Sequence, residues 1–110
     1  MDLVQAVSEH VRLFNESVRT GDFSAFVATF HEEAVMIFED VPVGPFHGRE
    51  AIAVAYADRP PSDSMTTVSV EETAPDAALV RFDWTTGGSG SMRLRWRDGQ
   101  VIELIVSFAR

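Results

Sequence analysis

Hydrophobic residues near the start of the chain recur at steps of three and four, with polar residues between them. They are Leu3, Val4, Val7, Val11, Phe14 and Val18. This spacing predicts an amphipathic helix of about five turns. Asp2 is a suitable N-cap and Gly21 a suitable left-handed end. Asp22 can cap a second helix at once, with the apolar face Phe23, Phe26, Val27 and Phe30.

The middle of the chain changes pattern twice. Ala34–Phe38 is a run typical of a β-strand, and it follows the polar stretch His31–Glu33. The segment Asp40–Gly48 contains two prolines and two glycines, which predicts a loop. Glu50–Asp58 then predicts a short helix that stops before Pro60.

From Ser64 onward the hydrophobic period is two, which predicts strands. We expect strands over Met65–Glu72, Leu79–Thr86, Met92–Arg97 and Val101–Phe108. A flexible loop is predicted over Gly87–Gly90. Asp98-Gly99 is a strong signal for a type I′ hairpin turn.

Helices followed by a meander of hairpins predict an α+β fold, with three N-terminal helices closing one face of a curved sheet. The predicted inner face is Val80, Phe82, Trp84, Met92, Leu94, Trp96, Ile102, Leu104, Val106 and Phe108. A curled sheet closed by helices leaves a cavity at its open end. The predicted outer face carries Arg93, Arg95 and Arg97 together with Leu79, Val101 and Ile105.

Composition limits the classes of function. The 110 residues form one domain (1–110), 45% of them hydrophobic, with a formal net charge of −8. Nucleic acid or an anionic membrane requires clustered basic residues, so neither is expected as a partner. The chain has no cysteine, and its first helix carries charges, which predicts neither a signal peptide nor a membrane span. We expect a cytoplasmic protein.

The element order resembles the cone-shaped α+β barrels of the nuclear transport factor 2-like superfamily. That group includes ketosteroid isomerase and the SnoaL-like polyketide cyclases. The resemblance covers essentially the whole chain and is sharpest at Phe38-Glu39-Asp40, at His47-Gly48-Arg49-Glu50-Ala51-Ile52 and at Tyr56. It implies the fold more firmly than an activity.

Ketosteroid isomerase uses an aspartate base and an oxyanion hole made of a tyrosine and a protonated aspartate. The resemblance places its base at Asp40 when counted back from His47, and at Phe38 when counted forward from Ala34. The two oxyanion donors fall at Phe14 and near Met92, which have no hydroxyl or carboxyl group. Losing one such donor costs about 2.7–4 kcal/mol of transition-state stabilisation, so steroid isomerisation by this route is not expected.

The other candidate residues have structural and functional interpretations. Tyr56 is a possible hydrogen-bond donor in the cavity or a core tyrosine, and His47 a site residue or a structural hydrogen-bonding group. The expected pocket lining is Phe14, Met36, Phe38, Phe82, Trp84, Met92, Leu104, Val106 and Phe108, which equally suits a filled core. His10 is expected to be exposed. No metal site is expected from His31, Glu32 and Glu33, whose spacing matches no metal motif.

These observations give one leading hypothesis and one alternative. The leading hypothesis is a SnoaL-like protein that binds a small apolar or aromatic molecule. It would act without a cofactor as an isomerase, cyclase or dehydratase, with Asp40 as general base. The alternative is a non-catalytic ligand-binding or dimerisation module. Apolar residues on the outer sheet face predict a homodimer in either case.

Overall fold

Helix α1 (Leu3–Thr20) begins and ends at the predicted caps in the computed structural model, which describes residues 1–108. The Asp2 carboxylate accepts a hydrogen bond from the backbone N–H of Gln5 at 3.1 Å. Gly21 has φ 79°, and its N–H donates to the Ser17 carbonyl at 2.8 Å. Both ends of the helix therefore have the partners that its capping residues predict.

The buried face of α1 differs from the predicted face, most clearly at Val4 and His10. Its buried residues are Leu3, Val7, His10, Val11, Phe14 and Ser17. Val4, predicted to be buried, is 57% exposed, whereas His10, predicted to be exposed, is only 5% exposed. His10 lies three residues after Val7 and four before Phe14, so it shares their face of the helix. The expectation for His10 was wrong because it followed residue type instead of position.

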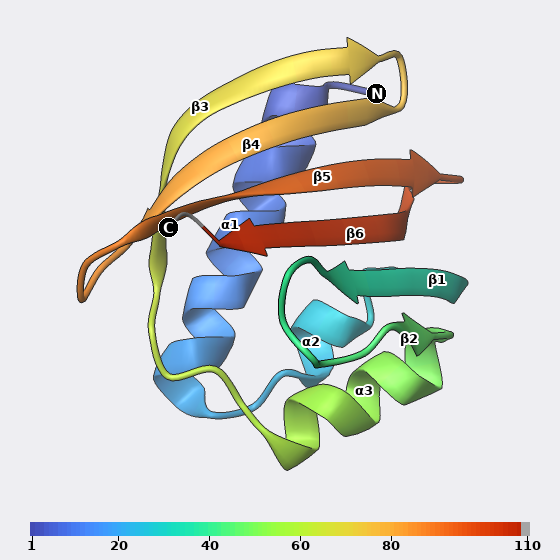
Figure 1. Cartoon of the computed structure of the whole chain (residues 1–110). Helices are drawn as coiled ribbons and strands as arrows, with labels where there is room; N and C mark the ends of the chain where they lie inside the picture. The colour runs from blue at the N-terminus through green and yellow to red at the C-terminus, as the bar shows by residue number, and fades with distance from the viewer. Residues whose placement is uncertain (109–110) are drawn as a thin grey trace.

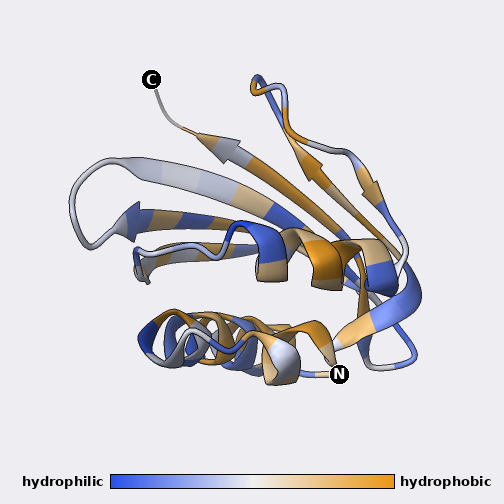
Figure 2. Cartoon of the chain, turned by 90° about the horizontal axis from the view of Figure 1, so that it is seen from below, coloured by the Kyte–Doolittle hydropathy of each residue, from blue (hydrophilic) through white to orange (hydrophobic). Residues whose placement is uncertain are grey.

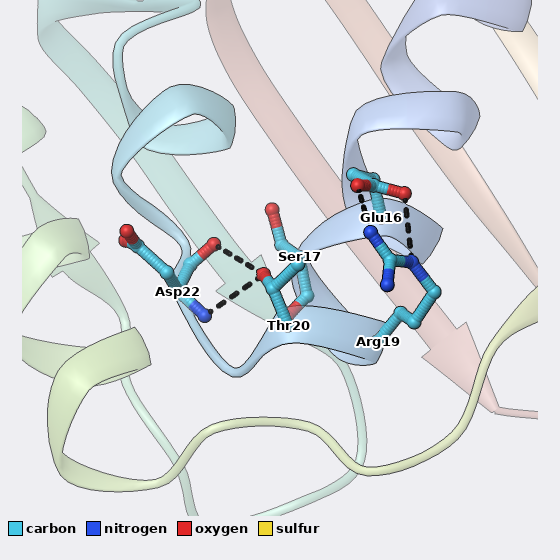
Figure 3. A network of polar contacts seen from close by, with 5 residues as sticks. All are labelled: Glu16, Ser17, Arg19, Thr20 and Asp22. Carbon is cyan, nitrogen blue, oxygen red and sulfur yellow. Dashed lines mark hydrogen bonds and ion pairs between the residues drawn. The ribbon is translucent and has the colours of Figure 1, made fainter.

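A compact set of polar contacts joins the end of α1 to the start of α2 (Ser24–Val27). The Arg19 guanidinium donates to the Glu16 carboxylate, and the Thr20 hydroxyl accepts from the Asp22 backbone N–H at 3.2 Å (Figure 3). The Asp22 carboxylate in turn accepts from the Ser24 N–H at 2.9 Å. The contacts of Thr20, Asp22 and Ser24 lie in the turn between the two helices, whereas the Arg19–Glu16 pair lies within α1.

Helix α2 is shorter than predicted, because β1 (Phe30–Phe38) begins at Phe30 instead of Ala34. Phe30 pairs with Val101 of the last strand, β6 (Gln100–Phe108), so long-range pairing competes with the local helical pattern. β1 and β6 are parallel. A second short strand, β2 (Phe46–His47), pairs antiparallel with β1 inside the segment predicted to be a loop.

The remaining elements complete one mixed sheet. Helix α3 is Arg49–Asp58, and the hairpin strands are β3 (Met65–Ala74), β4 (Ala77–Trp84) and β5 (Ser89–Arg97). The order is β2-β1-β6-β5-β4-β3, and every neighbouring pair except β1–β6 is antiparallel. The sheet is curved but not closed on itself (Figure 1). The predicted α+β class and curved sheet are confirmed.

The two hairpins around β5 show different turn chemistry. Asp98 and Gly99 have φ values of 53° and 78°, as a two-residue type I′ turn requires, which confirms this predicted turn. The preceding loop is shorter than predicted, because Ser89 and Gly90 already pair with β4. A Cβ atom at Gly90 would lie 2.7 Å from the Ser107 carbonyl oxygen and 2.8 Å from the Phe82 ring. Only glycine fits there, beneath that ring.

A β-bulge in β6 changes which residues face the helices. Trp96 pairs with Val101, whereas Arg95 pairs with Glu103, so Ile102 is the extra residue. A one-residue insertion reverses the facing of the side chains on one side of it. Val101, predicted on the outer face, is therefore 2% exposed, and Ile102, predicted on the inner face, is partly exposed.

The helices form a layer on the concave side of the sheet (Figure 2). Helix α1 packs against β3 and β4, α3 packs against β1 and β2, and α2 contacts both α1 and α3. The side chains between the layers form one hydrophobic cluster that includes residues of all three helices and of the sheet. No helix within residues 1–108 has the length and apolar character needed to cross a membrane.

Candidate functional site

The concave side of the sheet and the helices enclose a cavity of about 230 Å³, hereafter the cone cavity. Its lining residues come from all three helices and from five strands. They are His10, Phe14, Phe26, Phe38, Tyr56, Pro61, Met65, Phe82, Trp84, Met92, Leu104, Val106 and Phe108. None of these carries a formal charge at neutral pH when the histidine is neutral. The cone cavity is thus an aromatic, apolar site of the kind that binds small molecules.

The alternation of β5 and β6 explains why the sheet side of the cavity is apolar. Met92 is paired with Val106, and Leu94 is paired with Leu104, and these residues are buried. The residues between them, such as Arg93 and Ile105, project to the other face. Two adjacent strands therefore present a continuous apolar wall to the helices.

Asn15 fixes α1 against the sheet beside the cavity. Its side-chain amide donates to the Met65 carbonyl oxygen and accepts from the Met65 N–H, each at 2.9 Å. The amide thereby acts like a strand partner at the first residue of β3. Because Phe14 and Met65 both line the cone cavity, this contact sets one of its walls.

Two aromatic rings form the outer rim of the cavity. Phe38 at the end of β1 stacks on Phe108 at the end of β6, with ring centroids 6.3 Å apart and planes inclined by 10°. Phe38 is partly exposed and Phe108 is 40% exposed, whereas Met92 and Leu104, also in the lining, are buried. The exposed ends of β1 and β6 thus mark the mouth of the cavity.

His10 is the most unusual member of the lining. Its ring packs against the Phe26 ring with centroids 4.9 Å apart and lies 6.1 Å from that of Phe30. Its Nδ1 atom is buried and has no hydrogen-bond partner among the described residues. Burial lowers the pKa of His10 to about 4, so the imidazole is neutral at neutral pH. Its place between Val7 and Phe14 on the helical stripe is the sequence signal that would have predicted its burial.

Tyr56 brings a second polar group to the same cavity from α3. Its ring stacks on that of Phe23 at 5.0 Å and meets that of Phe26 edge-on at 5.4 Å. Tyr56 is 7% exposed, and burial raises the pKa of its phenol. The hydroxyl therefore stays protonated and can both donate and accept a hydrogen bond.

The structure brings most of the predicted pocket residues together. Eight of them lie in the cone cavity lining: Phe14, Phe38, Phe82, Trp84, Met92, Leu104, Val106 and Phe108. Met36 instead lines a neighbouring hollow of about 320 Å³, which shares Phe38, Tyr56 and Pro61 with the cone cavity. Phe14 and Met92, the positions at which the resemblance places oxyanion donors, both face the cone cavity.

Asp40 and His47 lie apart from this group. Asp40 follows β1 in a turn with φ 63°, so the strand alternation that would have directed it inward ends before it. Its side chain is exposed and is absent from the cavity lining, whereas Phe38, its rival for the base position, is present there. His47 is also exposed, at the end of β2, and lies outside the lining.

The charged residues outside the cavity form no recognisable metal centre. Within residues 1–108 there is no group of three or more histidine, aspartate or glutamate side chains arranged to hold a metal ion. A wide groove of about 1000 Å³ between α2 and α3 includes Asp22, Glu32, Arg49 and Glu50. The Arg49 guanidinium there donates to the Phe30 carbonyl oxygen at 3.3 Å, which is a structural role.

A family model for the SnoaL-like domain matches residues 11–104. The chain belongs to the SnoaL-like family. No curated protein sequence matches this SnoaL-like domain at a significant level.

Solved structures share the domain's fold at low sequence identity. A protein from Bacillus subtilis described as a candidate isomerase is 21% identical, with a TM-score of 0.79 over 99% of this chain and 90% of that chain. A candidate ketosteroid isomerase from Kribbella flavida is 16% identical, with a TM-score of 0.73 over 96% and 79%. An NTF2-like protein of unknown function from Mesorhizobium loti is 23% identical, with a TM-score of 0.70 over 100% and 96%. These similarities show the fold.

Proposed function

We propose that this SnoaL-like domain binds a compact, mainly apolar molecule in the cone cavity. The observation that carries the proposal is the lining itself: aromatic and aliphatic side chains surround about 230 Å³, with His10 and Tyr56 as buried polar groups. A cavity of ~150 Å³ lined by leucine, isoleucine and phenylalanine is large enough to bind benzene. The cone cavity is about one and a half times that size, which suits a fused two-ring compound.

Binding has stronger support than catalysis by Asp40. A general base must come within hydrogen-bond reach of the proton it removes. Asp40 is exposed and is not part of the cavity lining, so its carboxylate is poorly placed for a molecule enclosed there. The descriptions of two structural neighbours as candidate isomerases concern those proteins. For this domain we propose ligand binding as the primary function.

The test uses naphthalene as an apolar probe of matching size, followed by NMR of the methyl groups of Leu104, Val106 and Val54. We expect saturable shifts at Leu104 and Val106. Val106→Phe, which fills the cavity, should weaken binding at least about tenfold. Val54→Phe makes the same change at a residue that is 62% exposed on α3 and should bind like the wild type. Absence of saturable shifts in the wild type would refute the proposal.

We also propose a homodimer formed through the outer face of the sheet. Across that face Ile37 pairs with Ile105, Ile105 with Arg93, and Arg93 with Leu79. The three apolar residues of this row are only partly covered within one chain. Arg93 is held by the Glu39 carboxylate at 3.0 Å, which leaves the apolar side chains on either side of it for a partner.

A further inference from the structure

The Nδ1 atom of His10 is a buried polar atom for which the described residues provide no hydrogen-bond partner. Nδ1 is buried and without a hydrogen bond among the described residues, and the side chain as a whole is 5% exposed. A buried polar group without a partner is unfavourable, and such groups are rare in folded proteins. The imidazole ring itself belongs to the lining of the cone cavity, so a molecule that enters the cavity can bring a hydrogen-bond partner to this ring.

The lining favours an organic ligand over a lone water molecule as that partner. A single water molecule occupies about 30 Å³, so it would leave most of the 230 Å³ cavity empty. Besides His10, the lining offers only the Tyr56 hydroxyl and the Trp84 indole N–H as side-chain hydrogen-bonding groups within the described residues, and the other members are apolar. A ligand with an apolar body and one polar group matches this arrangement, because its apolar body packs against the aromatic side chains of the lining.

The charges around the cavity limit the ligand to a neutral compound. No arginine, aspartate or glutamate belongs to the lining that the structure describes. Burial of an ion without an opposite charge is strongly unfavourable. A neutral imidazole carries one donor and one acceptor nitrogen, and a hydroxyl group can serve either of them.

We propose that His10 is the hydrogen-bonding anchor of the cone cavity, and that the cavity takes a neutral fused two-ring aromatic bearing one hydroxyl group. The inference rests on the proposed binding function and adds the residue and the functional group that orient the ligand. His10 is a binding residue in this proposal. Its ring reaches the cavity from α1, opposite the sheet wall of Met92, Leu104 and Val106.

The experiment compares 2-naphthol with naphthalene, which differs from it by the hydroxyl group alone. The wild type should bind 2-naphthol about fivefold to tenfold more tightly than naphthalene, as one net hydrogen bond provides. In His10→Phe the preference for 2-naphthol over naphthalene should disappear. Equal affinities in the wild type, or an unchanged preference in His10→Phe, would overturn the role of His10 and leave the proposed function standing. Failure of both probes to bind would refute the proposed function itself.

A second measurement uses the wild type alone, so it tests the role of His10 even if His10→Phe does not fold. Imidazole nitrogen NMR of the wild type reports all three histidines of the chain. With 2-naphthol we expect the His10 signals to shift in the manner of a new hydrogen bond, and naphthalene should not cause this change. The exposed His47 serves as an internal control and should not move. Identical His10 spectra with both bound probes would contradict the proposal.

Discussion

The imidazole of His10 packs on the ring of Phe26, with centroids 4.9 Å apart and planes inclined by 54°. This contact joins α1 to α2 through a polar ring surrounded by apolar groups. It gives the ring a fixed place but offers no hydrogen bond to its nitrogens. The neutral state of His10 follows from this apolar environment, because burial removes water from the imidazole and disfavours its charged form.

Replacing His10 with phenylalanine should stabilise the ligand-free protein. The change removes the unpartnered Nδ1 atom, keeps an aromatic ring beside Phe26, and extends into a cavity with room for it. We expect the free energy of unfolding at pH 7 to rise by about 1–3 kcal/mol in urea denaturation. His47→Phe is the matched control at an exposed site and should leave stability nearly unchanged. A loss of stability in His10→Phe would show that the imidazole has a favourable partner.

Acid should destabilise the wild type through His10. The pKa of His10 is lowered from 6.5 to about 4 in the folded state, so the unfolded state binds the proton more tightly. The stability contribution of neutral His10 is complete above pH 6.5 and is lost as the pH falls through about 4. The total loss is about 3 kcal/mol, at ~1.36 kcal/mol for each pKa unit.

The measurement is the difference in unfolding free energy between wild type and His10→Phe, followed from pH 7 to pH 3.5. Taking the difference cancels the carboxylates, which titrate in both proteins. Among residues 1–108, no charged side chain lines the cavity on the helices or strands that face His10, and Tyr56 stays neutral throughout this range. A difference that does not change with pH would mean that His10 titrates normally and is hydrated.

Asp40→Asn should not alter the affinity for 2-naphthol. Asp40 lies in a turn after β1 and outside the lining, so removal of its charge leaves the cavity intact. Calorimetric titration of wild type and variant should give dissociation constants within about twofold of each other. Phe38→Leu, which changes the rim two residues earlier, is the positive control and should weaken binding. A tenfold loss of affinity in Asp40→Asn would show that Asp40 contributes to the binding site.

Ile105→Glu should prevent dimer formation without disturbing the cavity. Ile105 lies on the outer face between Ile37 and Arg93, and a buried unpaired carboxylate is costly. Sedimentation equilibrium should give about twice the 12.2 kDa chain mass for the wild type and the single chain mass for the variant. Val54→Glu on α3 is the control and should stay dimeric. A wild type that remains monomeric at high micromolar concentration would contradict the dimer.

Much of the architecture could be predicted from the sequence, because the helix caps and turn residues agree with the fold that the chain adopts. The caps Asp2 and Gly21 fix α1, and Asp98-Gly99 fixes the last hairpin, each through its own backbone chemistry. The family resemblance added the arrangement of helices over a curved sheet. The caps and the turn need only neighbouring residues to specify them, so the sequence predicts them directly.

Other features depend on contacts between distant parts of the chain. The start of β1 at Phe30 follows from its pairing with Val101, and no local signal marks it. The bulge at Ile102 reverses the facing of Val101, so strict alternation assigned both residues to the wrong faces. Pairing register of this kind is set by tertiary structure, which period-two reasoning cannot supply.

The candidate site likewise combines residues that the sequence pattern predicts with residues that it misses. Most of its apolar lining was predicted, because alternation on β4, β5 and β6 identifies the inner face. His10 was missed although Val7 and Phe14 place it on the buried stripe, since a polar residue there was assumed to be exposed. Strand alternation continued from Met36 and Phe38 would direct Asp40 inward, but positive φ ends the strand geometry at that residue.

A crystal structure of the domain with 6-bromo-2-naphthol tests the central claim most directly, because anomalous scattering locates the bromine without reference to the expected pose. We predict density inside the cone cavity, with the ring among Phe14, Trp84 and Leu104. The hydroxyl oxygen should lie about 2.7–3.2 Å from a His10 imidazole nitrogen. Bromine density confined to the molecular surface, or a ligand inside the cavity with its hydroxyl directed away from His10, would contradict the account.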